Sequence, residues 1–197
     1  MPTQSAHHQQ FTKRHLAHCH TTEKSNSRIR TALAVGNLFS CNSNFYLHRH
    51  DKPMNIDPKD PETYPVWTKD TIRYRDLDPN EHVNNGAINE YFEDGRVRFR
   101  KDYLTCAAHD VLSGFALVRF TVEYHRPLFF PGEVDIGTAI TRIGRTSYTL
   151  VQGLFRDGQC VASAEVISVL IDTQTGAPTP IPNEVRSVME QVAPNRS

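Results

Sequence analysis

The spacing of hydrophobic residues changes along the chain, and these changes mark the predicted elements. Residues 66–74, VWTKDTIRY, have the composition and spacing of a strand. Beyond residue 85 the apolar positions recur every three or four residues, which predicts one face of a helix of about 18 residues that begins near Asn85. That face comprises Ile88, Tyr91, Phe92, Gly95, Phe99 and Tyr103. Since Gly95 has no side chain, a sheet can approach the helix closely there.

Four strand-like runs follow the helical pattern, and turn residues separate them. The tightest signal is RDGQ at 156–159, where Asp-Gly suits a two-residue hairpin. The last run is apolar on nearly both faces and is therefore expected inside the sheet. A short helix is predicted from Asn183 to about Gln191. This order indicates an α+β fold with one long helix against an antiparallel sheet. The predicted strands are 115–125, 133–143, 147–156 and 160–171.

The first of these four strands has one apolar and one polar face. Val118, Phe120, Val122 and Tyr124 are predicted to point one way, and Arg119, Thr121, Glu123 and His125 the other. One helix covers only one face of a sheet, so the other face or an edge needs a partner. A polar second face is typical of a solvent-exposed surface or of a subunit interface that carries a functional site.

The first 60 residues lack any sustained hydrophobic period and are predicted to be a disordered extension. They hold seven of the ten histidines, but the irregular spacing of these histidines favours a solvated tail over a metal site. An acid-poor, Ser-rich leader also resembles an organellar transit peptide, although no clear amphipathic helix supports that interpretation. A third interpretation, which we favour, is that translation starts at Met54.

Charge and cysteine content narrow the function classes. The 197-residue chain has no formal net charge, but residues 1–53 contain seven Lys and Arg against two acidic residues, so the remainder is mildly acidic. An acidic domain argues against nucleic acid as the main partner. Four cysteines without a CxxC pair argue against a disulfide framework or a zinc ribbon and indicate a reducing compartment, which we take to be the cytoplasm. No apolar run is long enough to span a membrane.

The richest cluster of chemical groups is RDLDPNEHVNNG at residues 75–86. It ends where the helix begins, so the free amides near Asn85 and Gly86 can stabilise an oxyanion, and Asn84 or Asn85 can cap the helix. Asp78 can supply a base or a nucleophile to the same carbonyl carbon. Such a site hydrolyses an acyl bond without a metal or cofactor. Spacing alone also allows these residues to be ordinary turn and cap residues.

The stretch IRYRDLDPNEHVNNGAINEYFEDGRVRF resembles the hot-dog thioesterase superfamily, in its 4-hydroxybenzoyl-CoA thioesterase-like and acyl-ACP thioesterase-like branch. The resemblance continues through VEYHRPLFFPGEVDIGTAITRIGRTSYTL and DTQTGAPTPIP, and so covers about residues 66–182. The hot-dog domain is predicted to occupy residues 61–192. The resemblance implies a long central helix wrapped by an antiparallel sheet, with subunits joined edge to edge as a homodimer or a dimer of dimers and active sites at the subunit interface.

By this resemblance Asp78 is the catalytic carboxylate, and Asn80 and His82 have catalytic or orienting roles. Glu123, in VEYHRP, matches a further acidic residue that acts on water in some relatives. Three residues lie where contacts to the CoA side of the substrate are expected: Arg126, Arg145 and Ser147.

The chain departs from the family pattern at two places. Many relatives have Gly where this chain has Glu81, and an aromatic residue where it has Ile88 or Asn89. The second departure is expected to reshape the acyl pocket.

The predicted function is hydrolysis of a fatty or aryl acyl-CoA to the free acid and CoA. Action on acyl carrier protein and a non-catalytic acyl-CoA-binding module are the alternatives. The acidic domain disfavours the first, since carrier proteins are acidic. The presence of Asp78, Asn80 and His82 together argues against the second.

Overall fold

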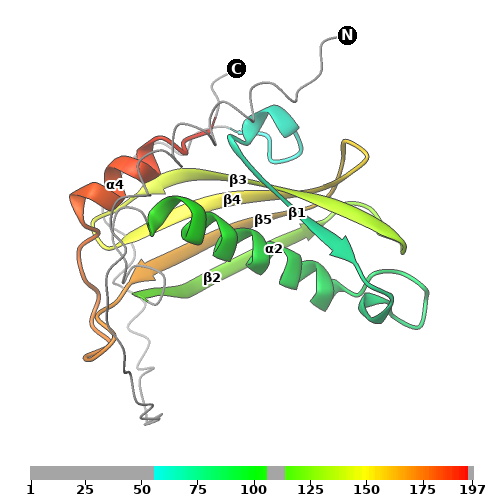
Figure 1. Cartoon of the computed structure of the whole chain (residues 1–197), viewed down its shortest axis with the longest axis horizontal. Helices are drawn as coiled ribbons and strands as arrows, with labels where there is room; N and C mark the ends of the chain where they lie inside the picture. The colour runs from blue at the N-terminus through cyan, green and yellow to red at the C-terminus, as the bar shows by residue number, and fades with distance from the viewer. Residues whose placement is uncertain (1–55, 106–113, 195–197) are drawn as a thin grey trace, which may run out of the picture. The chain divides into compact units, whose positions relative to one another are not determined.

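The computed structural model describes residues 56–105 and 114–194, and these form one sheet with a long helix on one face (Figure 1). Most of the predicted N-terminal extension, and with it the predicted start at Met54, lies outside the described residues. Residues 56–60 are described, and the carbonyl of Pro58 accepts a hydrogen bond of 2.7 Å from the Tyr64 hydroxyl. The extent of the extension stays a prediction.

The sheet has five antiparallel strands in the order β1-β3-β4-β5-β2. All the predicted strands are present, with ends that move by no more than two residues, so the α+β prediction is confirmed. β5 lies between β4 and β2, which confirms that the most apolar run is an interior strand. The strands are β1 (Val66–Ile72), β2 (Phe115–Tyr124), β3 (Gly132–Ile143), β4 (Ser147–Arg156) and β5 (Gln159–Leu170).

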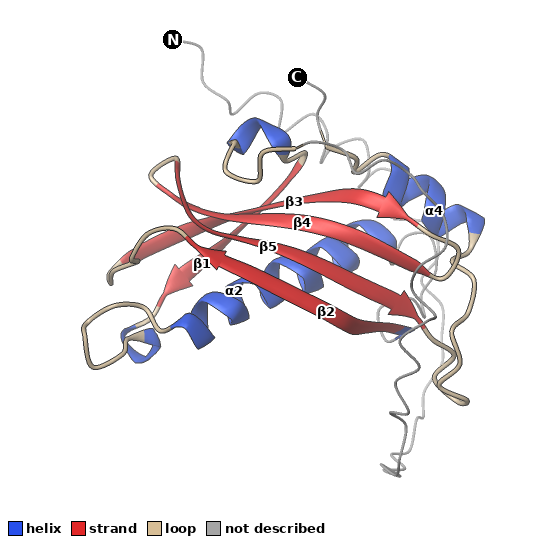
Figure 2. Ribbon diagram, turned by 180° about the vertical axis from the view of Figure 1, so that it is seen from behind, coloured by secondary structure: helices blue, strands red, loops and turns tan. Residues whose placement is uncertain are grey.

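The long helix α2 (Asn85–Phe99) crosses one face of the sheet and continues into a π-helical turn, η3 (Arg100–Leu104), as Figure 2 shows from behind. The predicted close approach at Gly95 is confirmed. A Cβ atom built there would lie 2.7 Å from Ile136 Cγ2 and 3.0 Å from Gln152 Nε2. The short helix α4 (Asn183–Glu190) buries Val185 and Met189 in the hydrophobic core that also holds Phe99 of α2.

The edge strand β2 corrects one detail of the predicted alternation. The pairing with β5 shifts between Leu117 and Arg119, so Val118 is an extra residue in a bulge and is 43% exposed. Phe120 and Val122 do pack against the helix-side core. The alternation therefore holds only beyond the bulge, because an inserted residue changes which face the preceding side chains occupy.

The face of the sheet opposite α2 is partly covered by the chain itself, which the sequence pattern did not predict. Tyr64, from the segment before β1, packs onto Gly137 of β3 and Gly153 of β4, where any Cβ would clash with its ring. Trp67 and Phe155 join it, with ring centroids 5.3–5.8 Å apart. Two glycines on adjacent strands thus make room for one aromatic side chain.

The strand register places the C-terminal ends of β1 and β2 at the same end of the sheet. Ile72, which ends β1, pairs with Gly132 at the start of β3, and Tyr124, which ends β2, pairs with Ala162 near the start of β5. Helix α2 begins at this same end (Figure 1). The loops after β1 and after β2 therefore lie beside the N-terminus of α2.

Candidate active site

The loop between β1 and α2 is anchored by a buried aspartate, Asp76. Its Oδ2 accepts hydrogen bonds from the Tyr91 hydroxyl at 2.6 Å and from the Arg73 amide at 2.7 Å. Its carbonyl accepts one from the Asn84 amide at 2.8 Å. Burial, and then the hydrogen bond to Asp76, raise the pKa of Tyr91. Asp76 thus ties the loop to the helix.

Asp78, two residues later, is more exposed and organises a tight turn. Its Oδ1 accepts hydrogen bonds from the Asn80 amide at 2.8 Å and from the His82 amide at 3.1 Å. Its Oδ2 receives only a 3.5 Å contact from the Asn80 side chain. Slight desolvation raises the pKa of Asp78, but the amide hydrogen bonds outweigh it and hold that pKa below the usual value. The carboxylate is therefore ionised at neutral pH, with one oxygen fixed and the other available.

Glu81 explains one departure from the family pattern. Its φ angle is 61°, in the left-handed region that favours glycine, and its amide closes the turn by a 3.1 Å bond to the Asp78 carbonyl. A glycine at this position meets no steric penalty. The turn geometry thus accounts for the glycine that many relatives carry, and this chain keeps the turn with a glutamate.

The N-terminus of α2 offers one free amide to this site. Asn84 caps the helix, since its Oδ1 accepts a 2.7 Å hydrogen bond from the Gly86 amide. The Asn85 amide has no hydrogen-bond partner among the described residues. Of the two amides predicted to hold an oxyanion, Gly86 is therefore engaged and Asn85 is available.

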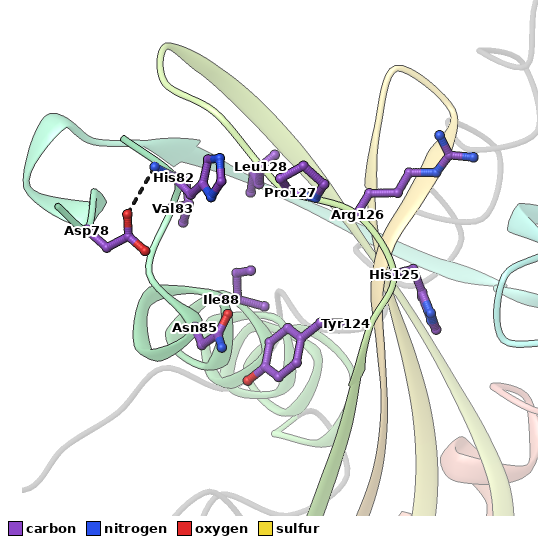
Figure 3. A pocket seen from close by; sticks show the side chains of 10 residues that line it. All are labelled: Asp78, His82, Val83, Asn85, Ile88, Tyr124, His125, Arg126, Pro127 and Leu128. Carbon is purple, nitrogen blue, oxygen red and sulfur yellow. Dashed lines mark hydrogen bonds between the residues drawn. The ribbon is translucent and has the colours of Figure 1, made fainter. Parts of the chain in front are cut away.

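A pocket of about 330 Å³ opens between these elements (Figure 3). One side is polar, with Asp78, His82 and Asn85, and the floor is apolar. The opposite side comes from the end of β2 and the loop that follows it. A carboxylate, a helix terminus and an apolar floor thus surround one hollow. The lining residues are Asp78, His82, Val83, Asn85, Ile88, Tyr124, His125, Arg126, Pro127 and Leu128.

Comparison with known proteins identifies the family. The sequence profile of the thioesterase-like superfamily matches residues 72–189, more than half of the chain. The chain belongs to the thioesterase-like superfamily. This match confirms the resemblance predicted from the sequence and, with it, the prediction of a thioester hydrolase.

Individual members of the superfamily agree in sequence and fold. The long-chain acyl-CoA thioesterase FadM of Escherichia coli is 28% identical over 132 residues, which cover 64% of this chain and 98% of FadM. A thioesterase from Thermus thermophilus, solved with coenzyme A and Zn, is 29% identical with a TM-score of 0.58, over 66% of this chain and 96% of that one. A predicted thioesterase from Bacillus stearothermophilus is 26% identical with a TM-score of 0.58, over 64% and 95%. The hot-dog fold is thereby confirmed.

The structure gathers some of the predicted site residues of this thioesterase-like chain and separates others. Asp78, His82, Asn85 and Arg126 line the pocket, and Asn80 contacts Asp78. Glu123 does not line it, because successive strand residues face opposite ways and its neighbour Tyr124 faces the pocket.

Arg145 and Ser147 lie at the hairpin between β3 and β4, at the other end of the sheet. There the Arg145 carbonyl accepts a 2.9 Å bond from the Ile181 amide. Neither side chain lines the pocket of its own chain.

Two pocket residues with polar side chains, Tyr124 and His125, were not among the predicted site residues. Tyr124 donates a 3.1 Å hydrogen bond to Asn89 Oδ1 on α2, across the mouth of the pocket. His125 Nε2 lies 2.9 Å from Ser163 Oγ, and desolvation lowers its pKa. The signal for Tyr124 was present in the sequence, since the strand alternation placed it on the face toward the helix. An aromatic ring from β2 thus borders the pocket beside Ile88 and Asn89, where many relatives have an aromatic residue on the helix.

Within residues 56–105 and 114–194, no group of three or more His, Cys, Asp or Glu side chains is arranged to hold a metal ion. No helix in those same ranges is both long and apolar enough to cross a membrane.

Proposed function

We propose that this protein hydrolyses a fatty or aryl acyl-CoA to the free acid and CoA. One observation carries the proposal: Asp78, whose carboxylate is ionised, and Asn85, whose amide has no hydrogen-bond partner among the described residues, line the same pocket. A carboxylate can activate water or attack directly, and an amide at a helix N-terminus can hold the negative charge that develops on a carbonyl oxygen. These are the two groups that thioester hydrolysis needs most.

The hydrogen bonds of Asp78 favour one assignment of its oxygens. Oδ1 accepts two amide hydrogen bonds and fixes the orientation of the carboxylate, so Oδ2 is the oxygen that acts. In the base mechanism Oδ2 takes a proton from a water molecule, and the water oxygen bonds to the thioester carbon. The carbon–sulfur bond then breaks, the electron pair leaves with sulfur, and the thiolate takes up the proton that Asp78 Oδ2 had accepted from water. The products are the carboxylic acid and CoA.

The apolar floor of the pocket suits the acyl group. Val83, Ile88 and Leu128 are each at most 3% exposed and line the hollow under the polar groups. His82 stands beside Asp78 with its ring edge-on to Phe129, at 5.0 Å between centroids. It is placed to orient the substrate or to return the proton to the leaving sulfur. FadM, whose name specifies long-chain acyl-CoA, supports the fatty acyl class.

The proposal includes a homodimer or a dimer of dimers. β2 is an edge strand, and it exposes Leu117 by 52% and Val118 by 43%. An exposed apolar edge is a surface that a second copy can cover. Glu123, Arg145 and Ser147 do not line their own pocket, so any role of theirs in the reaction requires the partner's pocket. Size-exclusion chromatography with light scattering tests the assembly.

Thiol release from a panel of acyl-CoAs tests the activity. Wild type, Asp78→Ala and Asp78→Asn are each incubated with aliphatic and aryl acyl-CoAs in the presence of a thiol reagent. We expect wild type to release thiol from at least one of them and the variants to be about 10²–10⁴-fold slower. Wild-type release no faster than that of Asp78→Ala on every substrate would refute the proposal. Parallel assays with acyl carrier protein at low and high salt separate the two carriers.

A further inference from the structure

The exposed aromatic side chains of this protein gather around the pocket. Among the described residues, four aromatic rings are more than two-fifths exposed: Tyr74 at 76%, Phe129 at 49%, Tyr124 at 44% and Phe130 at 42%. Tyr124 lines the pocket itself, and the other three come from the loops after β1 and after β2, at the same end of the sheet. Single exposed apolar residues are common, but a group beside a pocket marks a binding surface.

Tyr74, Phe129 and Phe130 are exposed on two neighbouring loops at this end of the sheet and are called the aromatic patch below. The rings of Tyr74 and Phe130 meet edge to face, with centroids 5.9 Å apart. Arg156 donates one hydrogen bond to the Phe129 carbonyl and another, of 2.8 Å, to the Pro131 carbonyl. The aromatic rings are thus presented to solvent by a loop that is held in place.

The aromatic patch is continuous with the pocket. Phe129 packs edge-on against His82, which lines the pocket next to Asp78. The loops that carry the patch and the reacting groups are also joined directly, because the Val83 amide donates a 2.8 Å hydrogen bond to the Leu128 carbonyl. A substrate with its thioester at Asp78 can therefore reach this patch with the part of the molecule that leaves the pocket.

Positive charge lies next to the patch. Arg75 directly follows Tyr74, its side chain is 78% exposed, and its nearest carboxylate contact is a long one of 4.0 Å to Asp76. The Arg126 guanidinium, by contrast, donates a 3.2 Å hydrogen bond to Gln159 Oε1 and is directed away from the pocket (Figure 3), so Arg75 is the arginine available to the patch. Aromatic faces stack on nucleobases, and arginine side chains bind phosphate. Exposed rings beside exposed arginine are the combination that recognises a purine nucleotide.

We propose that the aromatic patch of Tyr74, Phe129 and Phe130 binds the purine base of the CoA nucleotide, with Arg75 on its phosphate groups. This inference rests on the proposed acyl-CoA function and adds the subsite that holds the distant end of the substrate. Tyr74 and Phe130 supply the stacking surface, because both are exposed and Phe129 is in part occupied by His82. None of these residues takes part in the chemical step.

Binding of adenosine 3′,5′-bisphosphate, the nucleotide end of CoA, tests the subsite without any turnover. Titration calorimetry on the full chain compares wild type with Tyr74→Leu, Phe130→Leu and Arg75→Gln. We expect each variant to bind about five-fold or more weakly, the arginine variant with a smaller dependence on salt. Tyr74→Phe keeps the ring and is expected to bind as wild type does. Lys101→Gln, an equal charge loss on an exposed residue of η3, is the control for net charge.

Inorganic phosphate in place of the nucleotide separates purine recognition from simple anion binding. Wild-type affinity in Tyr74→Leu, Phe130→Leu and Arg75→Gln would overturn the assignment. It would also be overturned if the patch instead bound vesicles of phosphatidylglycerol and phosphatidylcholine in a Tyr74-dependent way without binding the nucleotide, since the occupant would then be a lipid surface.

Kinetics distinguish failure of the subsite from failure of the proposed function. On acyl-CoA, Tyr74→Leu is expected to raise KM about five-fold and leave kcat unchanged. On the matching acyl-pantetheine, which lacks the nucleotide, wild type and Tyr74→Leu are expected to be equal. Equal losses on both substrates would overturn the subsite. Absence of all turnover with intact, Tyr74-dependent nucleotide binding would refute only the proposed hydrolysis.

Discussion

Asp76 and Asp78 are two residues apart, and replacing each with alanine should have opposite consequences. Asp76→Ala should destabilise the fold and spare the chemistry of folded molecules. Asp78→Ala should abolish most activity and leave stability nearly unchanged. The two changes remove the same chemical group from the same loop, so each variant is the matched control for the other.

The magnitude for Asp76 follows from its hydrogen bonds. The carboxylate accepts one bond from the hydroxyl of Tyr91, which is 1% exposed, and one from the Arg73 amide. Net contributions to a charged acceptor are about 1.5–3 kcal/mol each, and the buried hydroxyl loses its partner. Asp76→Ala should therefore lower the free energy of unfolding by about 3–5 kcal/mol, which corresponds to roughly 10–18 °C in the melting temperature of a domain this size.

Asp78 contributes much less than Asp76 to the free energy of unfolding. The hydrogen bond from the Asn80 amide is exposed and the one from the His82 amide is only part-buried, so water can replace the carboxylate as their acceptor. The melting temperature of Asp78→Ala should therefore stay close to that of wild type, while kcat falls about 10²–10⁴-fold.

Thermal unfolding and thiol release, measured on the same preparations, check both halves of this prediction. Turnover should be compared at a temperature where all variants are folded. A double-mutant cycle with Tyr91→Phe should show a coupling of about 1–2 kcal/mol to Asp76→Ala and none to Asp78→Ala. Activity that fell in proportion to stability in both variants would refute the division of roles, as would wild-type turnover in Asp78→Ala.

Three further changes test the packing of the helix, its cap and its pairing with β1. Gly95→Ala places a Cβ 2.7 Å from Ile136 Cγ2, so overpacking of about 1–3 kcal/mol should outweigh a helix-propensity gain of about 1 kcal/mol and lower the denaturant midpoint of unfolding. The control is Gly86→Ala, whose Cβ meets only Asn84 Oδ1 at 3.1 Å, and its denaturant midpoint should equal or exceed that of wild type. Asn84→Ala should cost about 1 kcal/mol in denaturant unfolding and Asn84→Asp almost nothing, because an aspartate can still cap the Gly86 amide. Desolvation raises the pKa of Asp94, and so do a hydrogen bond to Asp70 and repulsion from its charge. The protonated Asp94 therefore stabilises the folded state at low pH, and this stabilisation is lost as the pH rises through the pKa that Asp94 has in the folded state. Asp94→Asn can donate a hydrogen bond to the Asp70 carboxylate at every pH, so its melting temperature should exceed that of wild type by more at pH 7 than at pH 4. An equal difference at both pH values would contradict this.

The secondary structure could be predicted from the sequence because its signals are local. The helix period from Ile88 to Tyr103 and the Asp-Gly turn before β5 depend only on neighbours in the chain. The outer face of the sheet could not be predicted in the same way. Tyr64 fits there only because Gly137 and Gly153 stand side by side on β3 and β4, and that adjacency depends on strand register.

The features of the loop before α2 could be predicted from the sequence better than the residues that β2 contributes to the candidate site. The position of the loop before the helix indicated the cap at Asn84 and a free amide, but the sequence did not show that the cap would engage Gly86 and leave Asn85. Strand alternation placed Tyr124 toward the helix and Glu123 away from it, yet Glu123 was the predicted site residue. The sequence pattern favoured the polar face, which holds Glu123, as the face that carries a site, whereas Tyr124 of the apolar face lines the pocket.

The connection between the two loops determines how substrate binding and chemistry divide between them. The Val83 amide and the Leu128 carbonyl join the loop of Asp78 to the loop of the aromatic patch, so the two are held at one separation. A nucleotide bound at the patch undergoes no change during hydrolysis of the thioester. Interactions that are equal in the ground and transition states lower KM without raising kcat. Residues of the patch should therefore control KM, whereas Asp78 and the Asn85 amide, which meet the charge that develops in the reaction, should control kcat.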